Sequence, residues 1–190
     1  MKRLGLLVTF LLLLNGCATV ISAVKPGETI EEERGSRSLG AVVDDSSIET
    51  AIKVNLNANE QLKRANISVI SFNGTVLLVG QVPTQELKNE ATRIATSANS
   101  SRTKAVHNEL EVAGTRTLLS RSNDALLTAK LKTIMLADPN VAGLRTKVVT
   151  ENGVVYLMGL VTKAEADQTA ELVANSSGVT KVVRAFEYID

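Results

Sequence analysis

"SFNGTVLLVGQV" at residues 71–82 and "TENGVVYLMGLV" at residues 150–161 are one pattern, displaced by 79 positions. In each stretch an Asn-Gly pair precedes an apolar run. Asn-Gly favours a two-residue hairpin turn, because both turn positions need a positive φ. The match continues on either side, where Asp45 aligns with Asp124 and Glu86 with Glu165. The sequence therefore predicts one domain present in two copies, at residues 44–113 and 122–190.

Each copy has the predicted element order α-β-β-α-β. The opening helices are expected to start at N-cap aspartates, Asp45 and Asp124, because apolar residues at helical spacing follow each of them. Those apolar residues are Ile48, Ile52 and Leu56 in copy one and Leu127, Leu131 and Met135 in copy two. A hairpin comes next, and then a second helix, opened by a capping box at Thr162–Glu165 in copy two and starting at Pro83 or Thr84 in copy one. Last strands are expected at 105–112 and 179–189. Each returns through the second helix as a right-handed crossover. The predicted fold class is α+β, with a three-stranded mixed sheet and two helices on one face in each copy.

The second strand of each copy separates two faces by alternation. One face is expected to lie under the helices and carries Val76, Leu78, Gly80 and Val82, which Val155, Leu157, Gly159 and Val161 match. The two glycines either let a helix approach the strand closely or mark a bulge.

The other face of the same strand is also apolar in both copies. It carries Leu77 and Val79 in copy one and Tyr156 and Met158 in copy two. Because an uncovered apolar sheet is unfavourable in water, these four residues are predicted to form the contact between the two domains. The alternative is that Leu77 and Tyr156 are only half exposed.

The first sixteen residues are typical of a signal peptide. Lys2 and Arg3 precede an apolar run, from Leu4 to Leu14, that is too short to span a bilayer. The following Leu14-Asn15-Gly16-Cys17 resembles a bacterial lipobox. That resemblance implies cleavage before Cys17, a thioether-linked diacylglycerol on its sulfur and a further acyl chain, such as palmitate, on its amino group. The alternative is an ordinary signal peptide with an incidental cysteine.

Residues 17–43 are expected to form the lipidated N-terminus and a flexible tether, since proline, glycine, serine and acidic residues interrupt any periodicity there. The residue after Cys17 is alanine and not aspartate. By resemblance to lipoprotein sorting rules, this implies a lipid-anchored location in the outer membrane, facing the periplasm.

The composition argues against several classes of function. With 21 basic and 20 acidic side chains, the chain has no electrostatic footprint for nucleic acid. The single histidine, His107, has no partner histidine or second cysteine in the sequence, and no nucleophile, phosphate-binding or metal-ligand motif occurs. We therefore expect no catalytic residue, no metal and no cofactor, and predict a binding protein and not an enzyme.

The most promising binding surface is the first helix of copy two. Leu126 and Leu136 fall outside its core-facing stripe, and Lys130 and Lys132 flank them. Copy one has Ser47 and Asn57 at the two leucine positions. Leucine beside lysine suits an anionic phospholipid membrane, where the ammonium groups meet phosphate and the leucines enter the acyl boundary. The alternative is that Leu126 packs under the linker between the domains and that the lysines are simply solvated.

The α-β-β-α-β order, the apolar strand with its glycine and the tandem arrangement resemble the BON domain, a small module of bacterial envelope proteins. With the lipobox upstream, the chain resembles the dual-BON lipoproteins of the outer membrane. The resemblance implies binding of anionic phospholipid, support of envelope integrity and of the outer-membrane assembly machinery, and partial recruitment to division sites. Two alternatives stay open: a protein-binding adaptor, and an osmotic-stress periplasmic chaperone-like protein.

Overall fold

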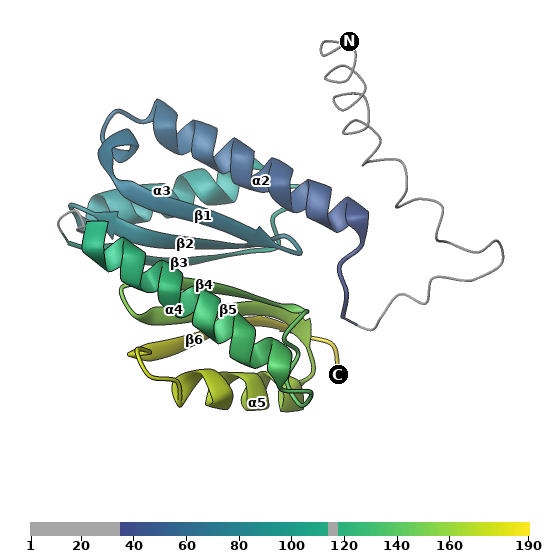
Figure 1. The fold of residues 1–190 in the computed structure, drawn as a ribbon. Coiled ribbons are helices and arrows are strands. Elements are labelled where there is room, and N and C mark those ends of the chain that lie inside the picture. Colours follow the sequence, from purple (N-terminus) through teal and green to yellow (C-terminus); the bar gives the residue numbers. More distant parts are fainter. Residues whose placement is uncertain (1–34, 114–117) are drawn as a thin grey trace, which may run out of the picture. The chain divides into compact units, whose positions relative to one another are not determined.

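A computed structural model describes residues 35–113 and 118–190 (Figure 1), so the signal peptide, Cys17 and most of the expected tether lie outside the described residues. Domain 1 consists of α2 (Leu39–Ala58), η3 (Leu62–Arg64), β1 (Asn66–Phe72), β2 (Thr75–Val82), α3 (Gln85–Ala98) and β3 (Ala105–Val112). Domain 2 consists of α4 (Leu118–Ala137), β4 (Thr146–Glu151), β5 (Val154–Val161), α5 (Lys163–Ala174) and β6 (Lys181–Tyr188). The predicted α-β-β-α-β order and α+β fold are confirmed.

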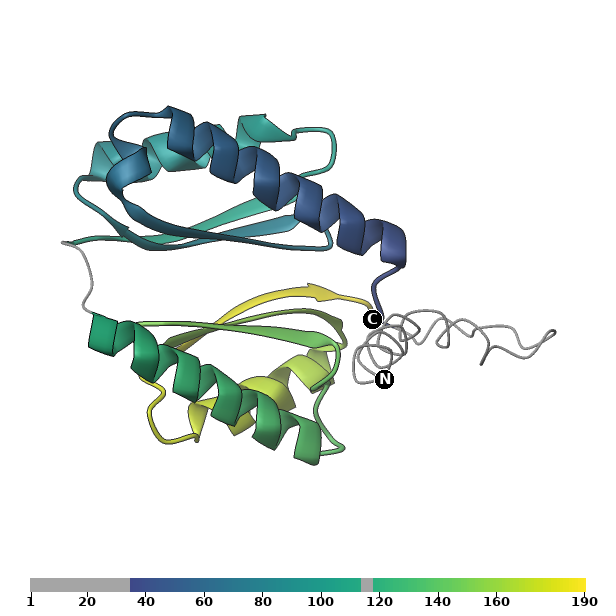
Figure 2. The ribbon, with the colours of Figure 1, turned by 45° about the horizontal axis from the view of Figure 1, so that its top comes forward.

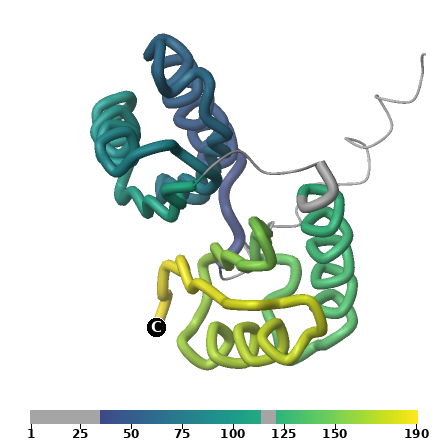
Figure 3. Tube along the Cα trace, turned by 90° about the vertical axis from the view of Figure 1, so that its left-hand side faces the viewer, coloured from purple at the N-terminus to yellow at the C-terminus, as the bar shows by residue number. Residues whose placement is uncertain are grey.

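Each domain contains one three-stranded mixed sheet. In domain 1 the strand order is β1-β2-β3, with β1 antiparallel and β3 parallel to β2. Domain 2 repeats this arrangement with β4-β5-β6. Figure 2 shows α2 and α3 over one face of the first sheet, and α4 and α5 over one face of the second. The Cα trace in Figure 3 shows α2 and α3 side by side, as two helices that share one sheet face must be.

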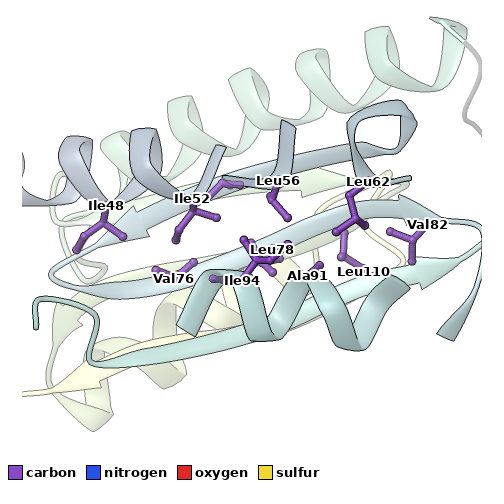
Figure 4. Packing of buried hydrophobic residues seen from close by; sticks show 12 residues of the cluster. Ile48, Ile52, Leu56, Leu62, Val76, Leu78, Val82, Ala91, Ile94 and Leu110 are labelled. Carbon is purple, nitrogen blue, oxygen red and sulfur yellow. The ribbon is translucent and has the colours of Figure 1, made fainter. Parts of the chain in front are cut away.

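The core of domain 1 is aliphatic, as the low aromatic content of the chain requires. Ile48, Ile52 and Leu56 project from α2 toward Val76 and Leu78 on the central strand (Figure 4). The α3 helix and β3 close the cluster with Ala91, Ile94, Ala95 and Leu110. In domain 2 the equivalent cluster comprises Leu131, Met135, Val148, Val155, Leu157, Ala170 and Val173. The helical spacing of the sequence therefore identified the core-facing stripes correctly.

The two hairpin turns adopt the predicted conformation. Asn73 and Gly74 have φ values of 51° and 80°, and Asn152 and Gly153 have φ values of 54° and 74°. Both residues of each turn thus lie in the left-handed region, where Asn and Gly are tolerated best.

The prediction that Asp45 and Asp124 are N-caps was wrong. Ser38 caps α2, where its hydroxyl accepts a hydrogen bond from the Ala41 N–H at 3.1 Å, and α4 starts at Leu118. Both aspartates lie inside their helices and are buried. Residues 39–43, expected in the tether, are therefore the first part of α2.

The buried aspartates bind the hairpins instead. The Asp45 carboxylate accepts the N–H groups of Asn73 and Gly74, both at 2.8 Å. Asp124 accepts those of Asn152 and Gly153 at 2.8 and 2.9 Å. Each carboxylate thus satisfies two turn amides, of which that of Gly74 is buried.

The strand glycines also differ from expectation. A Cβ added at Gly80 would lie 1.9 Å from the carbonyl oxygen of Asn66, and one added at Gly159 would lie 2.8 Å from that of Arg145. The close neighbour is therefore backbone at the edge-strand side of the sheet and not a helix. The β1–β2 register continues through Gly80 without an extra residue, so it is not a bulge either.

The second helices begin as the sequence indicates. Thr84 caps α3 and accepts a hydrogen bond from the Leu87 N–H. Thr162 and Glu165 form the reciprocal capping box of α5, in which the Thr162 N–H donates to the Glu165 carboxylate at 2.8 Å. Arg145 pairs with the same glutamate and so attaches the loop before β4 to the start of α5.

Candidate functional site

The candidate binding surface is the side of α4 that faces away from the sheet of domain 2. Leu131 and Met135 are buried against that sheet, and Leu127 and Ile134 are partly buried beside them. At about 100° per residue, this stripe leaves the opposite half of the helix outside the core of its own domain. That half carries all four of the predicted phospholipid-binding residues.

Leu126 and Leu136 are both exposed, at 71% and 59%. Lys130 follows Leu126 by four residues, and Lys132 precedes Leu136 by four, so each leucine has a lysine on its own helix face. By helical geometry the two pairs lie about 120° apart around the axis, on either side of the outward direction. The structure therefore presents two leucine–lysine pairs as the flanks of one outward surface.

The strip between the two pairs carries small side chains. Ala129 and Thr133 occupy it, and the Thr133 hydroxyl bonds back to the Ala129 carbonyl at 3.0 Å. Because this hydroxyl already donates a hydrogen bond within its own helix, it needs no partner from outside. A flat surface could therefore approach this strip closely while contacting the leucine–lysine pairs on both sides.

Leu144 is an exposed residue of the same region that sequence reasoning missed. Its side chain is 86% exposed in the loop between α4 and β4. The neighbouring Gly143 lies against the end of α4, because a Cβ added there would be 2.5 Å from the Met135 carbonyl oxygen. This close packing holds the loop beside Leu136, and only the folded loop reveals it. We call the set Leu126, Lys130, Lys132, Leu136 and Leu144 the α4 surface.

A hollow of about 500 Å³ lies beside Leu126. Its lining includes Leu126, Leu127, Lys130, Gly153, Ser177 and Gly178. Asp124 fixes the hairpin turn at one side through its two backbone hydrogen bonds. Gly178, with φ of 101°, allows the loop before β6 to pack on Leu127. The hollow is therefore walled by fixed backbone on two sides and by an exposed leucine on a third.

Lys130 lies at the rim of this hollow. Its ammonium donates to the carbonyl oxygen of Ser177 at 3.0 Å. An ammonium group has three donors, so this bond orients the lysine and leaves capacity for an anionic oxygen. Lys132 and Arg121 are exposed on the same helix and add positive charge.

Domain 1 offers no equivalent surface on α2. Ser47 and Asn57 take the places of Leu126 and Leu136; both are polar, with Asn57 exposed and Ser47 half-buried. The Ser47 hydroxyl donates to the Val43 carbonyl at 3.0 Å and stays within its own helix. The two copies share a core and differ in what they display.

The four residues predicted to form the inter-domain contact lie together in one buried cluster. Leu77, Val79 and Met158 are fully buried and Tyr156 is 4% exposed. Ile70, Phe72 and Ala185 complete the cluster. Burial, with the charges of Glu109, Glu111 and Glu151 nearby, raises the pKa of Tyr156 to about 12, so the phenol stays neutral at physiological pH.

Polar bonds surround this cluster. Lys147 of domain 2 donates to the Ser71 carbonyl of domain 1 at 3.2 Å and lies 3.4 Å from the Glu49 carboxylate. Asn73 of domain 1 donates to Glu187 at 2.7 Å. The apolar sheet faces are thus buried together with satisfied polar groups at their edge.

Little in the described residues suggests catalysis. His107 is exposed on β3. Across residues 35–113 and 118–190, no group of three or more His, Cys, Asp or Glu side chains is arranged to hold a metal ion. Within the same ranges no helix combines the length and apolarity needed to span a bilayer.

Comparison with known proteins identifies the family of this chain. The sequence matches the BON domain at residues 44–114 and again at residues 123–190. It is 33% identical to the outer membrane lipoprotein DolP of Haemophilus influenzae, covering 100% of this chain and 97% of that protein. It is 36% identical to a 21 kDa hemolysin of Actinobacillus pleuropneumoniae, covering 80% of this chain and 78% of that protein.

More distant relatives share the same span. The osmotically-inducible protein Y of Escherichia coli is 28% identical, with 82% of this chain and 81% of that protein covered. Among solved structures, the C-terminal domain of CdsD, a structural protein of the type III secretion system of Chlamydia trachomatis, is 14% identical with a TM-score of 0.30. That similarity covers 77% of this chain and 67% of the other and is too low to support a functional comparison.

The resemblance to BON-domain proteins is thereby confirmed in both halves of the chain, and it points to a non-enzymatic envelope protein. The BON match in each domain, with a lipoprotein relative aligned along the full length, shows that this chain belongs to the BON-domain family as a dual-BON envelope lipoprotein.

Proposed function

We propose that this protein is an outer-membrane lipoprotein, anchored by acylated Cys17 and facing the periplasm, whose α4 surface binds anionic phospholipid. In this role it supports envelope integrity and outer-membrane protein assembly, including at division sites. One observation carries the phospholipid proposal: α4 displays two exposed leucine–lysine pairs on either side of a strip of small residues. The full-length similarity to an outer membrane lipoprotein supports the location.

The proposed contact follows from the chemistry of the interface. When α4 lies flat on the membrane, Leu126, Leu136 and Leu144 enter the acyl boundary while Lys130 and Lys132 meet phosphate groups. Each basic residue near an anionic surface contributes about 1 kcal/mol. The hollow beside Lys130 offers space for part of a headgroup.

The lipid anchor makes a weak contact effective. Two or three acyl chains on Cys17 would hold the domains at the bilayer almost permanently. Binding by α4 then becomes an intramolecular event, for which a flexible linker gives a high effective concentration. The α4 surface would therefore orient the domains on the membrane and need not recruit them to it.

The test is vesicle sedimentation of residues 17–190 with phosphatidylglycerol vesicles. Charge reversal of both lysines, Lys130→Glu with Lys132→Glu, removes about 2 kcal/mol of attraction even before repulsion is counted, so binding should fall at least about 30-fold. Leu126→Asn should weaken binding about tenfold by removing an inserted apolar side chain.

Val54→Asn is the matched control, because Val54 is a similarly exposed apolar residue, at 60%, on the equivalent helix of domain 1. It should bind as the parent does. Equal binding by the lysine variant and the parent would remove α4 from the proposal.

A second candidate function is a protein-binding adaptor, since the exposed Leu136 and Leu144 could equally engage an envelope partner such as the assembly machinery. A partner captured by the double-lysine variant, which no longer binds vesicles, would favour the adaptor. The similarity to an osmotically-inducible protein keeps a chaperone-like role under stress as a further alternative.

A further inference from the structure

The first turn of α2 carries an apolar stripe outside every cluster described above. Leu39, Val42 and Val43 are 86%, 43% and 64% exposed. Their spacing of three and four residues places them on one face of the helix. They form a contiguous apolar patch, which we call the α2 stripe.

The α2 stripe faces away from its own domain. The buried face of α2 starts only at Asp45 and continues through Ile48 and Ile52. At about 100° per residue, the centre of the stripe lies about 130° around the axis from that buried face. The sheet of domain 1 packs on a different side of α2, so only a surface outside this domain could cover the stripe.

The stripe is also held firmly, although it lies at the edge of the domain. Ser38 caps the helix at the Ala41 N–H. Arg37 donates to the Asp45 carboxylate at 2.7 Å, and its guanidinium lies 4.0 Å from the centroid of the Phe72 ring. A buried aspartate and an aromatic ring thus fix Arg37, two residues before the helix. The first turn of α2 is therefore held in place with the stripe exposed.

The fold itself does not require these apolar residues. By the repeat register, domain 2 has Arg121 where domain 1 has Val42, and Ser122 where domain 1 has Val43. The equivalent helix therefore forms with polar residues at these positions. Leu39 has an apolar counterpart in Leu118, so it is the two valines completing the stripe that belong to copy one alone, just as the exposed leucines of α4 belong to copy two.

We propose that the α2 stripe inserts into the bilayer interface beside the acylated Cys17, as a second membrane contact independent of α4. This proposal depends on the acylation contained in the proposed function. Twenty-two positions separate Cys17 from Leu39. Even fully extended, that length of chain spans at most about 75 Å, and the stripe is the first folded apolar surface that follows the anchoring residue.

The chemistry of this contact differs from that of α4. The tether just before the stripe carries three consecutive acidic residues, Glu31 to Glu33, and Asp44 follows it. With Arg34 and Arg37 in the same segment the acidic residues are only in slight excess, so no net positive charge attracts anionic lipid there. The contact is therefore apolar, and it works on neutral lipid, resists salt and requires attachment through Cys17.

The experiment uses two properties of the chain, its single cysteine and its lack of tryptophan. Residues 17–190 are coupled through the Cys17 thiol to a maleimide lipid in neutral phosphatidylcholine vesicles. Leu39→Trp supplies one fluorescent reporter and Val54→Trp, about four turns further along the same helix, supplies the matched control. Phospholipids brominated on their acyl chains quench only an indole that enters the bilayer.

For the coupled chain, the Leu39→Trp reporter should shift to shorter wavelength and lose at least half of its emission to brominated lipid, in low and in high salt. The Val54→Trp reporter should do neither, and uncoupled Leu39→Trp protein mixed with the same vesicles should stay unquenched. Adding Val42→Asn and Val43→Asn to the Leu39→Trp chain should abolish the quenching without lowering its melting temperature.

Two results would overturn the proposal. One is a coupled Leu39→Trp reporter as accessible to solvent as Val54→Trp. The other is a blue shift without bromine quenching that depends on protein density on the vesicle, which would mean that the stripe meets a second copy of the chain. Lys130→Glu with Lys132→Glu should leave the Leu39→Trp quenching intact, so failure at α4 and failure at the stripe give different results.

Discussion

Asp45 shows how one buried side chain can join three parts of a domain. Its carboxylate binds the hairpin amides of Asn73 and Gly74, the Ser71 hydroxyl and the Arg37 guanidinium. Burial alone raises the pKa of this carboxyl, but the bonds from Gly74, Ser71, Asn73 and Arg37 outweigh burial and leave the pKa below its usual value. The ionised form is therefore the one that the fold stabilises.

We predict that Asp45→Asn lowers the free energy of unfolding at neutral pH by about 3 kcal/mol, because it removes charge-assisted bonds to buried donors. Since the folded pKa lies below the unfolded pKa of about 3.9, the stabilisation is present above that unfolded value and is lost as pH falls through the folded pKa. Denaturant unfolding from pH 7 to pH 2 should show a weaker acid dependence in the variant.

Asp44→Asn is the control for Asp45. Its carboxylate is half exposed and lies 3.4 Å from Arg102, so the change should be below about 0.5 kcal/mol. Equal stability of the Asp45 variant and the parent would contradict the proposed role of the buried carboxylate.

At the scale of the elements, a glycine in the central strand of domain 1 permits the close approach of its neighbour. Gly80 has a φ of 128°, and an added Cβ would collide with the Asn66 carbonyl. Gly80→Ala should lower the free energy of unfolding by about 2–3 kcal/mol, through backbone strain and displacement of β1. Thermal or denaturant unfolding measures this loss.

Gly40→Ala provides the opposite result within the same domain. Gly40 lies in the first turn of α2, and an added Cβ there would have only ordinary contact with the Ser38 hydroxyl at 3.7 Å. Alanine in a helix is favoured over glycine by about 0.5–1 kcal/mol, so this variant should be slightly more stable. Equal destabilisation by Gly80→Ala and Gly40→Ala would contradict the view that the room available for a Cβ decides the effect.

At the scale of the whole molecule, the cluster around Leu77, Val79, Tyr156 and Met158 joins residues of both repeats. We predict that Met158→Ala, a change in domain 2, lowers the free energy of unfolding by about 2–4 kcal/mol and speeds amide exchange in β2 of domain 1. Met135→Ala removes an equally buried methionine from the separate core of domain 2 and should affect β2 much less. Unchanged exchange in β2 of the Met158→Ala chain would mean that the cluster does not couple the repeats.

Features with a local cause could be predicted from the sequence. Asn-Gly turns, the Thr162 capping box and the apolar helix stripes depend on residues a few positions apart, and all three are confirmed. Asp45 was misassigned because its partners in the hairpin lie 26 to 29 positions away, beyond any helix-start signal. Leu144 was missed because its exposure depends on how Gly143 packs against α4, which no linear pattern records.

The two repeats keep nearly the same interior and differ on their outer helix faces, and this makes the BON fold a scaffold onto which surfaces can be grafted. Ser47 and Asn57 already project from α2 where leucines stand in α4. Ser47→Leu, Ala51→Lys and Asn57→Leu, with Lys53 already present, should therefore give domain 1 the same two leucine–lysine pairs, and vesicle sedimentation should show the added binding without a change in melting temperature. Duplication of such a module preserves the core of each copy, so each copy can acquire a different binding surface through substitutions on its outer helix face.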